Sequence, residues 1–501
     1  MRHADVEISE RVLRLDNGWL RFIHQLNFVR RIEHIIEEDH QRIYQETLSV
    51  LSSKLQTVTG ILKRLVKPPP EEGTAPASAG TRLRYAFKKE SLDKAIEEFE
   101  LWQRTADQSW FLLMRIRDPR IDAALANSEP LEPGPNTASA IPSTVTIRSG
   151  LQDADTVTVA GPRLTINADE LSRMTTWQVP YSSAFFAQRL STSSVSTKYI
   201  LNEIRCQPLT KYNSIKKDAR DLARKLQHND PHTFGLLSCK GLAVPSKVPF
   251  AAPGATEPDV VFTLVFRVPP RLGDMRSLRD LLVNTSGPAS LSGRFDIARE
   301  LVKAVNYVHT FGFVHKAIRP ESFLASTPDG GHTHSLFLVG FENFRREDGW
   351  TQRRGDSAPD RNLYRHPSRQ GACPHEDFVM QHDIYSLGVC LLEIGLWQSF
   401  FAYGPQDGTP ILTELPGLEP GIAADQVGHF VQMRAKDSLL QLAQTHLPRL
   451  MGTRYAEIVT ICLTCLDPGN TDFGDAAEFH DEDGIQVGVR YIEKVSTRLS
   501  K

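Results

Sequence analysis

The sequence lacks a dominant charge of one sign, an abundance of cysteine and long hydrophobic runs. Its 501 residues carry 58 basic and 60 acidic side chains, a formal net charge of −2, so no overall field favours nucleic acid or an anionic membrane. Six cysteines are too few for a disulfide scaffold, which makes a reducing, cytoplasmic compartment the expectation. No apolar run reaches the roughly 18–20 residues that span a bilayer. The polar start, Met1–Glu7, is unlike a signal peptide.

Apolar residues recur three and four positions apart in the first third of the chain. This spacing predicts helices over 5–66, over Leu92–Trp102 and over Trp110–Ile116, with a helical turn at Ile121–Leu125. We expect Ser91 and Asp107 to cap the two later helices, and Asp16-Asn17-Gly18 to start or kink an earlier one. The apolar stripes predict the core of an antiparallel helical bundle over residues 1–126. A basic cluster in this segment leaves membrane contact as a weaker alternative.

Residues 127–180 are rich in Ser, Thr, Pro and Gly, which predicts an interdomain linker. Short alternating runs at Val145–Arg148 and Thr156–Val159 indicate two brief β segments within it.

The most informative stretch is Phe313–Leu324, which reads Phe-Val-His-Lys-Ala-Ile-Arg-Pro-Glu-Ser-Phe-Leu. An amphipathic helix predicted over Leu291–His309 precedes it, and an apolar strand, Leu336–Val339, leads from it to Gly340-Phe341-Glu342. Helix, loop and hairpin in this order resemble the catalytic-loop region of protein kinases, whose usual strings are H-R-D-x-x-x-x-N and D-F-G. The resemblance implies a bilobal kinase-like domain over 181–501, with a small lobe at 181–270 and a large lobe at 271–501.

The first string keeps its structural residues and loses its chemical ones. His315 matches the His that packs the loop, and Lys316 replaces the Arg. Ala317 stands at the position of the catalytic Asp, which accepts the proton of the substrate hydroxyl. Arg319 takes the place of the loop Lys. Ser322 replaces the Asn that binds a second magnesium ion, and a hydroxyl is a weaker ligand.

The second string is changed at its metal ligand. Gly340 stands where the metal-binding Asp belongs, Phe341 is kept, and Glu342 is the only carboxylate nearby. The resemblance therefore implies that no catalytic set is intact and that no metal is bound. Recruitment of Glu342 as a metal ligand is the alternative.

The small lobe of an active kinase needs a glycine-rich loop, because only glycine lets backbone N–H groups approach the phosphates closely. Between Gly161 and Gly235 the chain has no glycine. We expect the third strand of that lobe at Tyr199–Ile204 and its two last strands at Leu236–Gly241 and Val260–Arg267, followed by a hinge at Pro269-Pro270. The position of the ATP-pairing Lys then falls among several residues: Lys198, Asn202, Glu203 or Arg205. A helix over Asn213–Gln227 offers two carboxylates for a partner: Asp218 and Asp221.

Scaffold residues return after the loop. Asn362–Pro367 resembles the peptide platform before the A-P-E motif, with Ser368 in the Glu position, and Asp383–Gly388 matches the D-x-x-S-x-G start of a buried helix. The resemblance implies structural roles for Pro367, Asp383 and Gly388. Asp383 would accept hydrogen bonds from the catalytic-loop backbone, and Gly388 would allow tight helix packing.

Further helices are predicted in the large lobe from apolar spacing. Ser277 is expected to cap a short one over Leu278–Val283. Three others follow in the last 70 residues: Asp437–Leu447, Tyr455–Leu466 and Ile492–Leu499. Cys462 and Cys465 form a C-x-x-C on one of them. Without a second pair we interpret them as core residues, with zinc or redox chemistry as the weaker alternative.

A helical bundle before such a degenerate domain resembles a fungal family, in which a HeLo domain of heterokaryon-incompatibility proteins precedes a kinase-like domain. Three phrases carry the resemblance: Tyr307–Lys316, Leu338–Glu342 and His382–Trp397. The architecture is also similar to the mixed-lineage-kinase-like pseudokinase of animal necroptosis, whose kinase-like domain restrains a membrane-permeabilising bundle. The bundle here is short at its N-terminus and lacks the apolar first helix of HeLo-type proteins.

We therefore expect an α+β protein in which an antiparallel helical bundle is followed by a bilobal kinase-like domain. Its expected function is that of a catalytically inactive signalling or scaffold protein, a pseudokinase. We expect protein partners, either its own bundle or an upstream receptor, and no nucleic acid. No cofactor is predicted. The alternatives are an atypical active Ser/Thr kinase that uses ATP and Mg²⁺, and a membrane-acting or oligomerising bundle effector.

Overall fold

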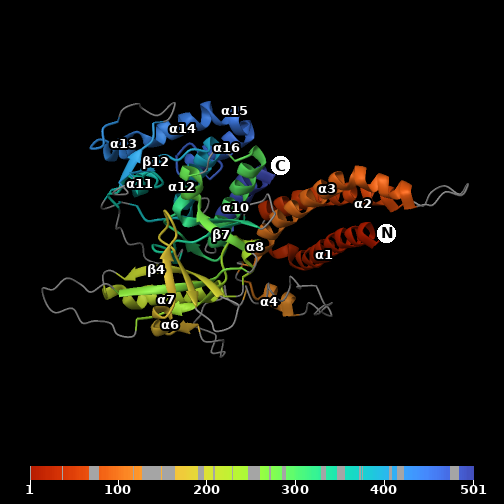
Figure 1. Cartoon of the computed structure of the whole chain (residues 1–501), viewed down its shortest axis with the longest axis horizontal. Coiled ribbons are helices and arrows are strands. Elements are labelled where there is room, and N and C mark those ends of the chain that lie inside the picture. Colours follow the sequence, from red (N-terminus) through yellow and green to blue (C-terminus); the bar gives the residue numbers. More distant parts are fainter. Residues whose placement is uncertain are drawn as a thin grey trace, which may run out of the picture. The chain divides into compact units, whose positions relative to one another are not determined.

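The computed structural model mixes helices with strands, as expected for an α+β protein, and divides into two compact units (Figure 1). One unit consists mainly of Met1–Val145 and the other mainly of Thr146–Leu499. The structure describes residues 2–36, 38–66, 78–114, 116, 118–126, 148, 164–189, 197–206, 209–227, 229–245, 260–269, 272–284, 289–328, 335–346, 356–371, 374, 376–404, 409–414, 422–473 and 485–500.

The N-terminal unit is helical, as predicted. Its elements are α1 (Arg2–Ile32), the 3₁₀ turn η1 (Glu33–Ile35), α2 (Glu38–Val66), α3 (Ser78–Leu113) and α4 (Pro119–Ala126). The side chain of Gln41 closes the turn between α1 and α2, since its Nε2 donates to the carbonyls of Glu33 (2.8 Å) and Ile36 (2.7 Å). These carbonyls lie where a helix ends and would otherwise lack partners.

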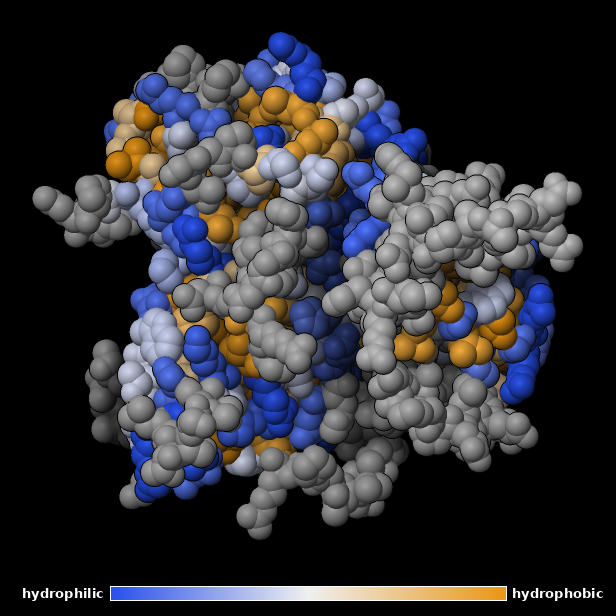
Figure 2. All heavy atoms as spheres, turned by 45° about the vertical axis from the view of Figure 1, so that its right-hand side comes forward, coloured by the Kyte–Doolittle hydropathy of each residue, from blue (hydrophilic) through white to orange (hydrophobic). Residues whose placement is uncertain are grey.

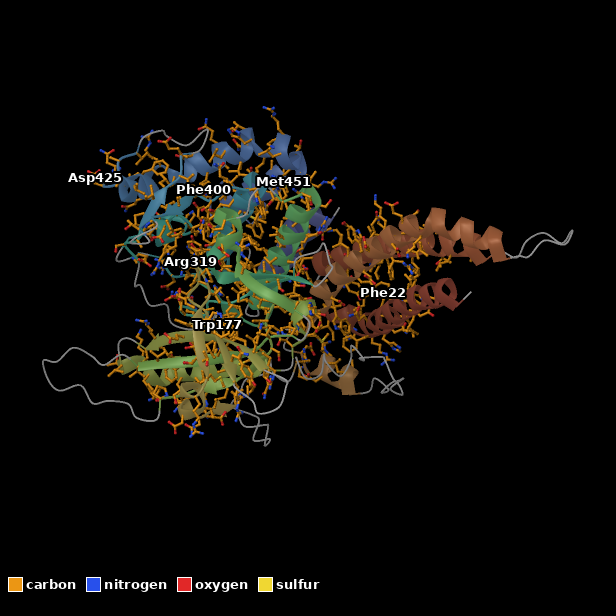
Figure 3. The ribbon with its side chains drawn as sticks, in the orientation of Figure 1. Phe22, Trp177, Arg319, Phe400, Asp425 and Met451 are labelled. Carbon is orange, nitrogen blue, oxygen red and sulfur yellow. The ribbon has the colours of Figure 1, made fainter. Side chains whose placement is uncertain are left out.

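The predicted apolar stripes form the core of this unit. Leu92, Ile96, Phe99 and Trp102 of α3 are buried among apolar residues of α1 and α2, Phe22 among them (Figure 3). Ion pairs reinforce the packing at its edges. Arg11 of α1 binds Asp93 of α3 through two hydrogen bonds, and Lys54 of α2 lies 2.7 Å from Glu98.

Two predicted helix caps in this unit were wrong, and no helix starts at Asp16-Asn17-Gly18. Ser91 and Asp107 lie inside α3, which is one continuous helix from Ser78 to Leu113. Asp107 accepts a hydrogen bond from Gln25 of α1 (3.0 Å) in the buried interface, so this polar residue joins two helices rather than capping one. Gly18 lies within α1, where a Cβ atom would come within 2.5 Å of the Gln103 side chain. Its lack of a side chain permits this close approach.

The second unit begins with a six-stranded sheet in the order β1-β5-β6-β4-β3-β2. Its strands are β1 (Thr165–Ile166), β2 (Thr175–Gln178), β3 (Phe185–Arg189), β4 (Thr197–Cys206), β5 (Cys239–Ala243) and β6 (Val260–Arg267). All neighbours are antiparallel except β1 and β5. Four helical elements lie between these strands in the chain: the short helices α6 (Ala168–Ser172) and α8 (Pro231–Phe234), the 3₁₀ turn η2 (Leu209–Lys211) and the longer α7 (Tyr212–Lys225). The strands and the helix predicted at 199–267 are thereby confirmed.

The linker prediction was wrong over residues 164–180, because β1, α6 and β2 lie there and belong to the sheet unit. Ile166, Leu171 and Met174 from this segment cover one face of the sheet, where they pack against Leu201 and Val265. The two β segments predicted at 145–148 and 156–159 lie outside the described residues, apart from Arg148. The predicted hinge is described only at Pro269.

The remainder of the second unit is mainly helical (Figure 1). Its first part comprises β7 (Leu272–Ser277), α9 (Leu278–Asn284), α10 (Leu291–Thr310), β8 (Phe313–Val314), η3 (Pro320–Ser322), β9 (Phe323–Pro328), β10 (Ser335–Leu338), β11 (Arg345–Arg346), α11 (Pro359–Asn362) and η4 (Pro367–Arg369). Its second part comprises α12 (Met380–Leu396), β12 (Phe401–Tyr403), β13 (Pro410–Leu412), α13 (Val427–Met433), α14 (Ala435–Thr445), α15 (Leu447–Met451), α16 (Thr453–Leu463), α17 (Ile485–Tyr491), the π-helical turn η5 (Ile492–Ser496) and α18 (Thr497–Ser500).

Helix α12 forms the centre of this part. All its residues from Met380 to Gly395 are buried, which agrees with the prediction of a helix apolar on every side. Gly388 faces α16, where a Cβ atom would lie 2.8 Å from Cys462 Cβ. The Ser277 hydroxyl accepts from the N–H of Asp280 (3.1 Å) and so caps α9 as predicted.

Hydrophobic and hydrophilic residues are interspersed on the face of the molecule that Figure 2 shows. The large exposed apolar side chains of the described residues are spread over several elements: Val12, Leu13, Leu20, Trp177, Leu291, Ile411, Met433 and Leu450. None of the described helices combines the length and the hydrophobicity that a membrane span requires.

Candidate functional site

The loop after β8 is held by the carboxylate of Asp383 in the buried helix α12. The carboxylate accepts hydrogen bonds from the backbone N–H groups of His315 (2.7 Å) and Lys316 (2.9 Å), and His309 Nε2 lies 3.2 Å away. Burial raises the pKa of Asp383, but the hydrogen bond from His309 and the nearby imidazoles outweigh it, so the net shift is downward. Lys316 has a φ of +67°, a left-handed conformation uncommon for residues other than glycine. Asp383 therefore holds a strained turn. Its hydrogen bonds to the loop backbone are the contact that the sequence motif implied.

His315 serves packing. Its Nε2 lies 2.9 Å from the Val339 carbonyl and must be the protonated nitrogen, because a carbonyl only accepts. The ring also contacts Phe341 edge-on at 4.8 Å. Burial lowers the pKa of His315 to about 4, so the imidazole is neutral at pH 7.

The positions that would carry chemistry in a kinase are occupied differently here. Ala317 presents a buried methyl group. The Ser322 hydroxyl donates to the Arg319 carbonyl (2.7 Å) and accepts from the Arg319 N–H (3.2 Å), which engages it in the local turn. Gly340 has a φ of +80°, and a Cβ atom there would lie 3.2 Å from Ser322 Cβ. A carboxylate side chain at 340 would therefore be strained.

Glu342, the alternative metal ligand, forms an ion pair. Its Oε1 lies 2.8 Å from Arg319 Nη2. A metal ion at Glu342 would compete with a fixed guanidinium for the same carboxylate. Among the described residues, no group of three or more His, Cys, Asp or Glu side chains is arranged to hold a metal.

Strand register divides the four candidates for the Lys position between the two faces of the sheet. Asn202 pairs with Leu264, and Ile200 and Ile204 pair with Phe266 and Phe262, so these residues share one face of the sheet. Tyr212 of α7 contacts Phe262 at 5.2 Å, which places the helix on that face. Because side chains alternate along a strand, Lys198 projects toward the same face nearer its start, whereas Glu203 and Arg205 project to the other.

Of the two candidates on the α7 face, Lys198 is exposed and Asn202 is buried. Asn202 is 1% exposed, and its Oδ1 has no hydrogen-bond partner in the described structure. Of the two α7 carboxylates, Asp221 is paired with Arg346 of β11 at 3.1 Å, and Asp218 lines a pocket described below.

A short loop, residues 179–184, connects β2 with β3 within the stretch between Gly161 and Gly235 that contains no glycine. Ser277 Oγ donates to the Pro180 carbonyl (2.6 Å), and the Tyr181 ring lies 5.2 Å from that of Tyr403. Ser183 Oγ would be 3.8 Å from a Cβ atom at Gly340. Tyr181 has a φ of +56°. The loop is therefore held against the helical part of the unit by polar and aromatic contacts.

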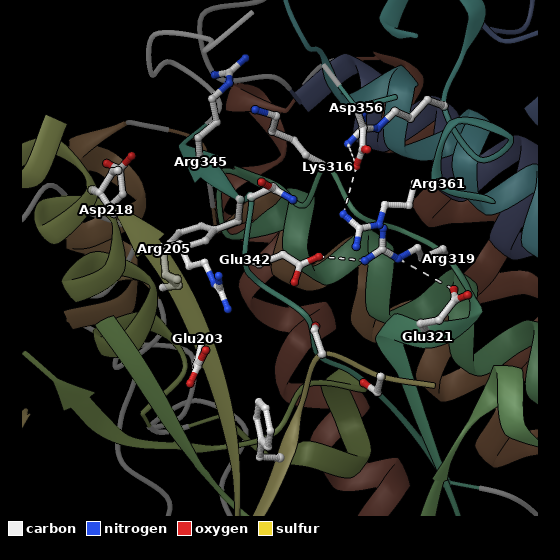
Figure 4. Close-up of a pocket in the computed structure, with 18 of the residues that line it drawn as sticks. Glu203, Arg205, Asp218, Lys316, Arg319, Glu321, Glu342, Arg345, Asp356 and Arg361 are labelled. Atoms are coloured by element: carbon white, nitrogen blue, oxygen red, sulfur yellow. Dashed lines mark hydrogen bonds and ion pairs between the residues drawn. The ribbon is translucent and has the colours of Figure 1, made fainter. Parts of the chain in front are cut away.

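A pocket of about 1120 Å³ lies beside this loop (Figure 4). Its walls come from β4, η2 and α7 on one side and from the segments after β8 and β10 on the other. Charged residues of both signs line it: Glu203, Arg205, Lys211, Asp218, Lys316, Arg319, Glu321, Glu342, Arg345, Asp356, Asp360, Arg361 and Arg365. Several are already paired, since Arg319 binds Glu342 and Asp356 lies 3.2 Å from Arg361 and 3.8 Å from Arg365.

A buried charge network next to the pocket was missed in the sequence. Arg279 of α9 is fully buried and lies 2.9 Å from Glu321 and 2.7 Å from Glu393 of α12. The Tyr364 hydroxyl also donates to Glu393 (2.8 Å), and that of Tyr403 donates to Glu321 (2.9 Å). The available signal was Glu393 itself, a carboxylate within the otherwise apolar stretch Val389–Leu396. A buried charge needs a partner, but nothing in the sequence named Arg279.

The remaining predicted scaffold residues have local roles. Pro367 begins η4. Ser368 Oγ, at the expected Glu position, lies between His366 Nδ1 (3.0 Å) and His382 Nε2 (3.2 Å). Cys462 and Cys465 are buried, and burial raises the pKa of Cys462 to about 12. These thiols belong to the core.

Comparison with known proteins supports a kinase-like domain in this chain. The chain is 29% identical over 180 residues to eukaryotic translation initiation factor 2-alpha kinase 1 of Rattus norvegicus, covering 31% of this chain and 27% of that protein. The same kinase of Mus musculus is 28% identical over 179 residues, with the same coverage. The match thus spans about a quarter of the length of each relative. No protein-family model matches the chain.

Proposed function

We propose that the chain is a pseudokinase, a protein-kinase-like protein that signals by conformation and does not transfer phosphoryl groups. The observation that supports it most is the state of the metal-binding positions. Gly340 is packed against Ser322 in a left-handed conformation, and Glu342, the carboxylate two residues further along the chain, is bound to Arg319. Without a carboxylate ligand for Mg²⁺, the charge of the transferring phosphate would not be neutralised.

The retained scaffold supports the bilobal part of the proposal. Strand β4, helix α7 and strands β5 and β6 follow one another as the third strand, helix and last strands of a small lobe would. Asp383 supports the loop from a buried helix. The small lobe would then begin near Thr165 rather than at residue 181, and the linker would end before it.

For the N-terminal unit we propose a HeLo-like helical bundle regulated by the kinase-like domain, in fungal incompatibility or cell-death signalling. The helices α1, α2 and α3, with a common apolar core, support a bundle. The regulating partner would be a protein: the bundle itself or an upstream receptor, with a cytoplasmic location. A partner can shift the bundle between two conformational states only by binding those states with different affinities. Membrane action or oligomerisation by residues 1–126 would be a further role.

The rival function is that of an atypical active kinase, and the similarity to translation-factor kinases favours it. An active kinase would require Glu342 to leave Arg319 and bind the metal ion. It would also require a general base from another residue, because Ala317 cannot accept a proton. Each of these functions supplies orders of magnitude in rate. The joint loss is therefore difficult to replace.

A thermal-shift titration of the full chain with ATP, with and without Mg²⁺, tests the proposal. A ligand at 100 times its Kd stabilises by about 2.7 kcal/mol, which corresponds to several degrees at roughly 2–4 °C per kcal/mol for a large domain. We expect no Mg²⁺-dependent shift. A shift that requires Mg²⁺ and is lost in Glu342→Gln would support the active kinase instead.

A further inference from the structure

Strand β2 forms one edge of the six-stranded sheet, and within the described residues no other strand pairs with its outer side. All four of its residues are exposed. Trp177, labelled in Figure 3, is 42% exposed and stacks on Phe186 of the neighbouring β3 at 5.4 Å. An aromatic side chain is thus held on the sheet and remains open to solvent at its edge.

Edge strands are usually protected against pairing with another chain by charged side chains, proline, bulges or a short length. Strand β2 has neither charge nor proline, since it reads Thr-Thr-Trp-Gln, and its register with β3 runs without a bulge. Threonine and tryptophan also favour strands. The opposite edge, β1, is only two residues long. Of the two edges of this sheet, β2 is therefore the one open to a further strand.

The outward backbone groups of β2 follow from its pairing with β3. The N–H of Val179 donates to the carbonyl of Ala184 (3.0 Å), and hydrogen-bonded pairs alternate with non-hydrogen-bonded pairs along an antiparallel ladder. Trp177 therefore directs its backbone groups toward β3, whereas Thr176 and Gln178 direct theirs away from it. The free edge thus offers a donor and an acceptor on each side of Trp177.

We propose that β2 pairs antiparallel with β2 of a second copy of this chain, so that the two sheets continue into one another. In this register Thr176 of each copy lies opposite Gln178 of the other, and each such pair exchanges two N–H···O bonds. The two-fold axis passes between the Trp177 residues of the two copies, which form a non-hydrogen-bonded pair with closely spaced side chains. This inference is independent of the proposed function.

The pattern of the edge favours a second copy over an unrelated strand. Outward residues flank Trp177 symmetrically, so the edge is complementary to itself, as a two-fold interface requires. None of its side chains is charged, so two copies meet no like charges across the pair, and aromatic pairs in such a position stabilise antiparallel strands. Two edges of four residues bury far less than the roughly 800 Å² per partner of a stable interface. We therefore expect a reversible dimer whose population depends on concentration.

Sedimentation velocity of the full chain over a range of concentrations measures this association. We expect reversible dimers of the native chain. Trp177→Lys and Trp177→Glu should each weaken dimerisation at least about tenfold, because like charges would lie directly opposite each other. The matched control is Ile411→Lys, at an exposed apolar residue of another strand, β13, which should leave the association unchanged.

An equimolar mixture of the two charged variants tests the geometry. Position 177 faces itself across the axis, so Lys opposes Glu in the mixed dimer, which should be at least about tenfold stronger than the dimer of either variant alone. Thr176→Pro removes the outward N–H without removing a hydrogen bond to β3, so it should weaken dimerisation without unfolding the sheet. A native chain that stays monomeric, dimers that persist in both charged variants, or a mixture no stronger than its components would overturn the proposal.

Discussion

Replacing Asp383 with Asn tests the support of the loop after β8. The substitution keeps size and shape but changes one acceptor oxygen into an NH₂ donor. In the native protein the two oxygens serve the N–H groups of His315 and Lys316 at 2.7 and 2.9 Å, with His309 Nε2 at 3.2 Å. Whichever way the amide is turned, an NH₂ group faces at least one backbone N–H.

The cost follows from these contacts. One buried backbone donor without an acceptor costs about 1–3 kcal/mol, and each remaining bond weakens by about 1 kcal/mol when its acceptor loses the charge. We expect a loss of about 3 kcal/mol in unfolding free energy for the second unit, a large part of a typical total of about 5–15 kcal/mol. The left-handed Lys316 should be released first, because Asp383 holds its N–H.

Hydrogen exchange with mass spectrometry in increasing urea measures this loss in each unit of the full chain separately. The control is Asp425→Asn, at an exposed position (Figure 3), which should change the unfolding free energy by less than about 0.5 kcal/mol. A loss below about 1 kcal/mol for Asp383→Asn, or one equal to the control, would refute the view that this carboxylate holds the loop.

Three further predictions concern the same unit. Arg279→Met removes the cation nearest the buried Glu393 and leaves Glu321 with Arg319 alone, 3.9 Å away; it should cost about 3–5 kcal/mol in urea unfolding. Arg276→Met, at a side chain that is 42% exposed, should cost below about 1 kcal/mol, and similar losses for the two variants would contradict the network. Gly388→Ala places a Cβ atom 2.8 Å from α16 and should lower the Tm, unlike Gly428→Ala, where the space is open. Acid should destabilise the fold because three buried or half-buried histidines have lowered pKa values. Below about pH 6.5 the unfolded chain then binds more protons than the folded one, and the free energy of unfolding falls toward pH 5 by up to about 4 kcal/mol per pH unit. These pKa values are about 4, 4 and 3 for His315, His366 and His382; a flat stability between pH 6.5 and 5 in urea titrations would show that they do not control it.

Local patterns predicted much of the second unit. Helix α10 and the buried α12 were expected from apolar spacing, since burial on one or all sides leaves a direct mark on sequence. The Ser277 cap was also predicted, because a cap and its helix are adjacent in the chain. These features depend on residues only a few positions apart.

The errors came from contacts that join distant segments. Asp107 looks like a cap but binds Gln25, 82 positions away. The segment 164–180 has the composition of a linker, yet β5 and β3 supply partners for its strands. Pairing between distant strands leaves little trace in a single sequence.

The candidate site likewise has some features that the local sequence predicts and others that depend on contacts between distant segments. Loss of the catalytic residues could be read directly from Ala317 and Gly340. The engagement of Glu342 by Arg319 and the burial of Asn202 depend on how loop and sheet pack, which residue spacing does not encode.

Phosphotransfer itself tests the central claim most directly. The full chain is incubated with Mg²⁺ and ATP labelled at the γ-phosphate, and incorporation into the chain and into a generic protein substrate is measured beside Glu342→Gln. We predict incorporation at background level and identical for both proteins, because Glu342 is paired with Arg319 and no carboxylate stands at position 340. Incorporation above background by the native chain that disappears in Glu342→Gln would contradict the account and establish an active kinase.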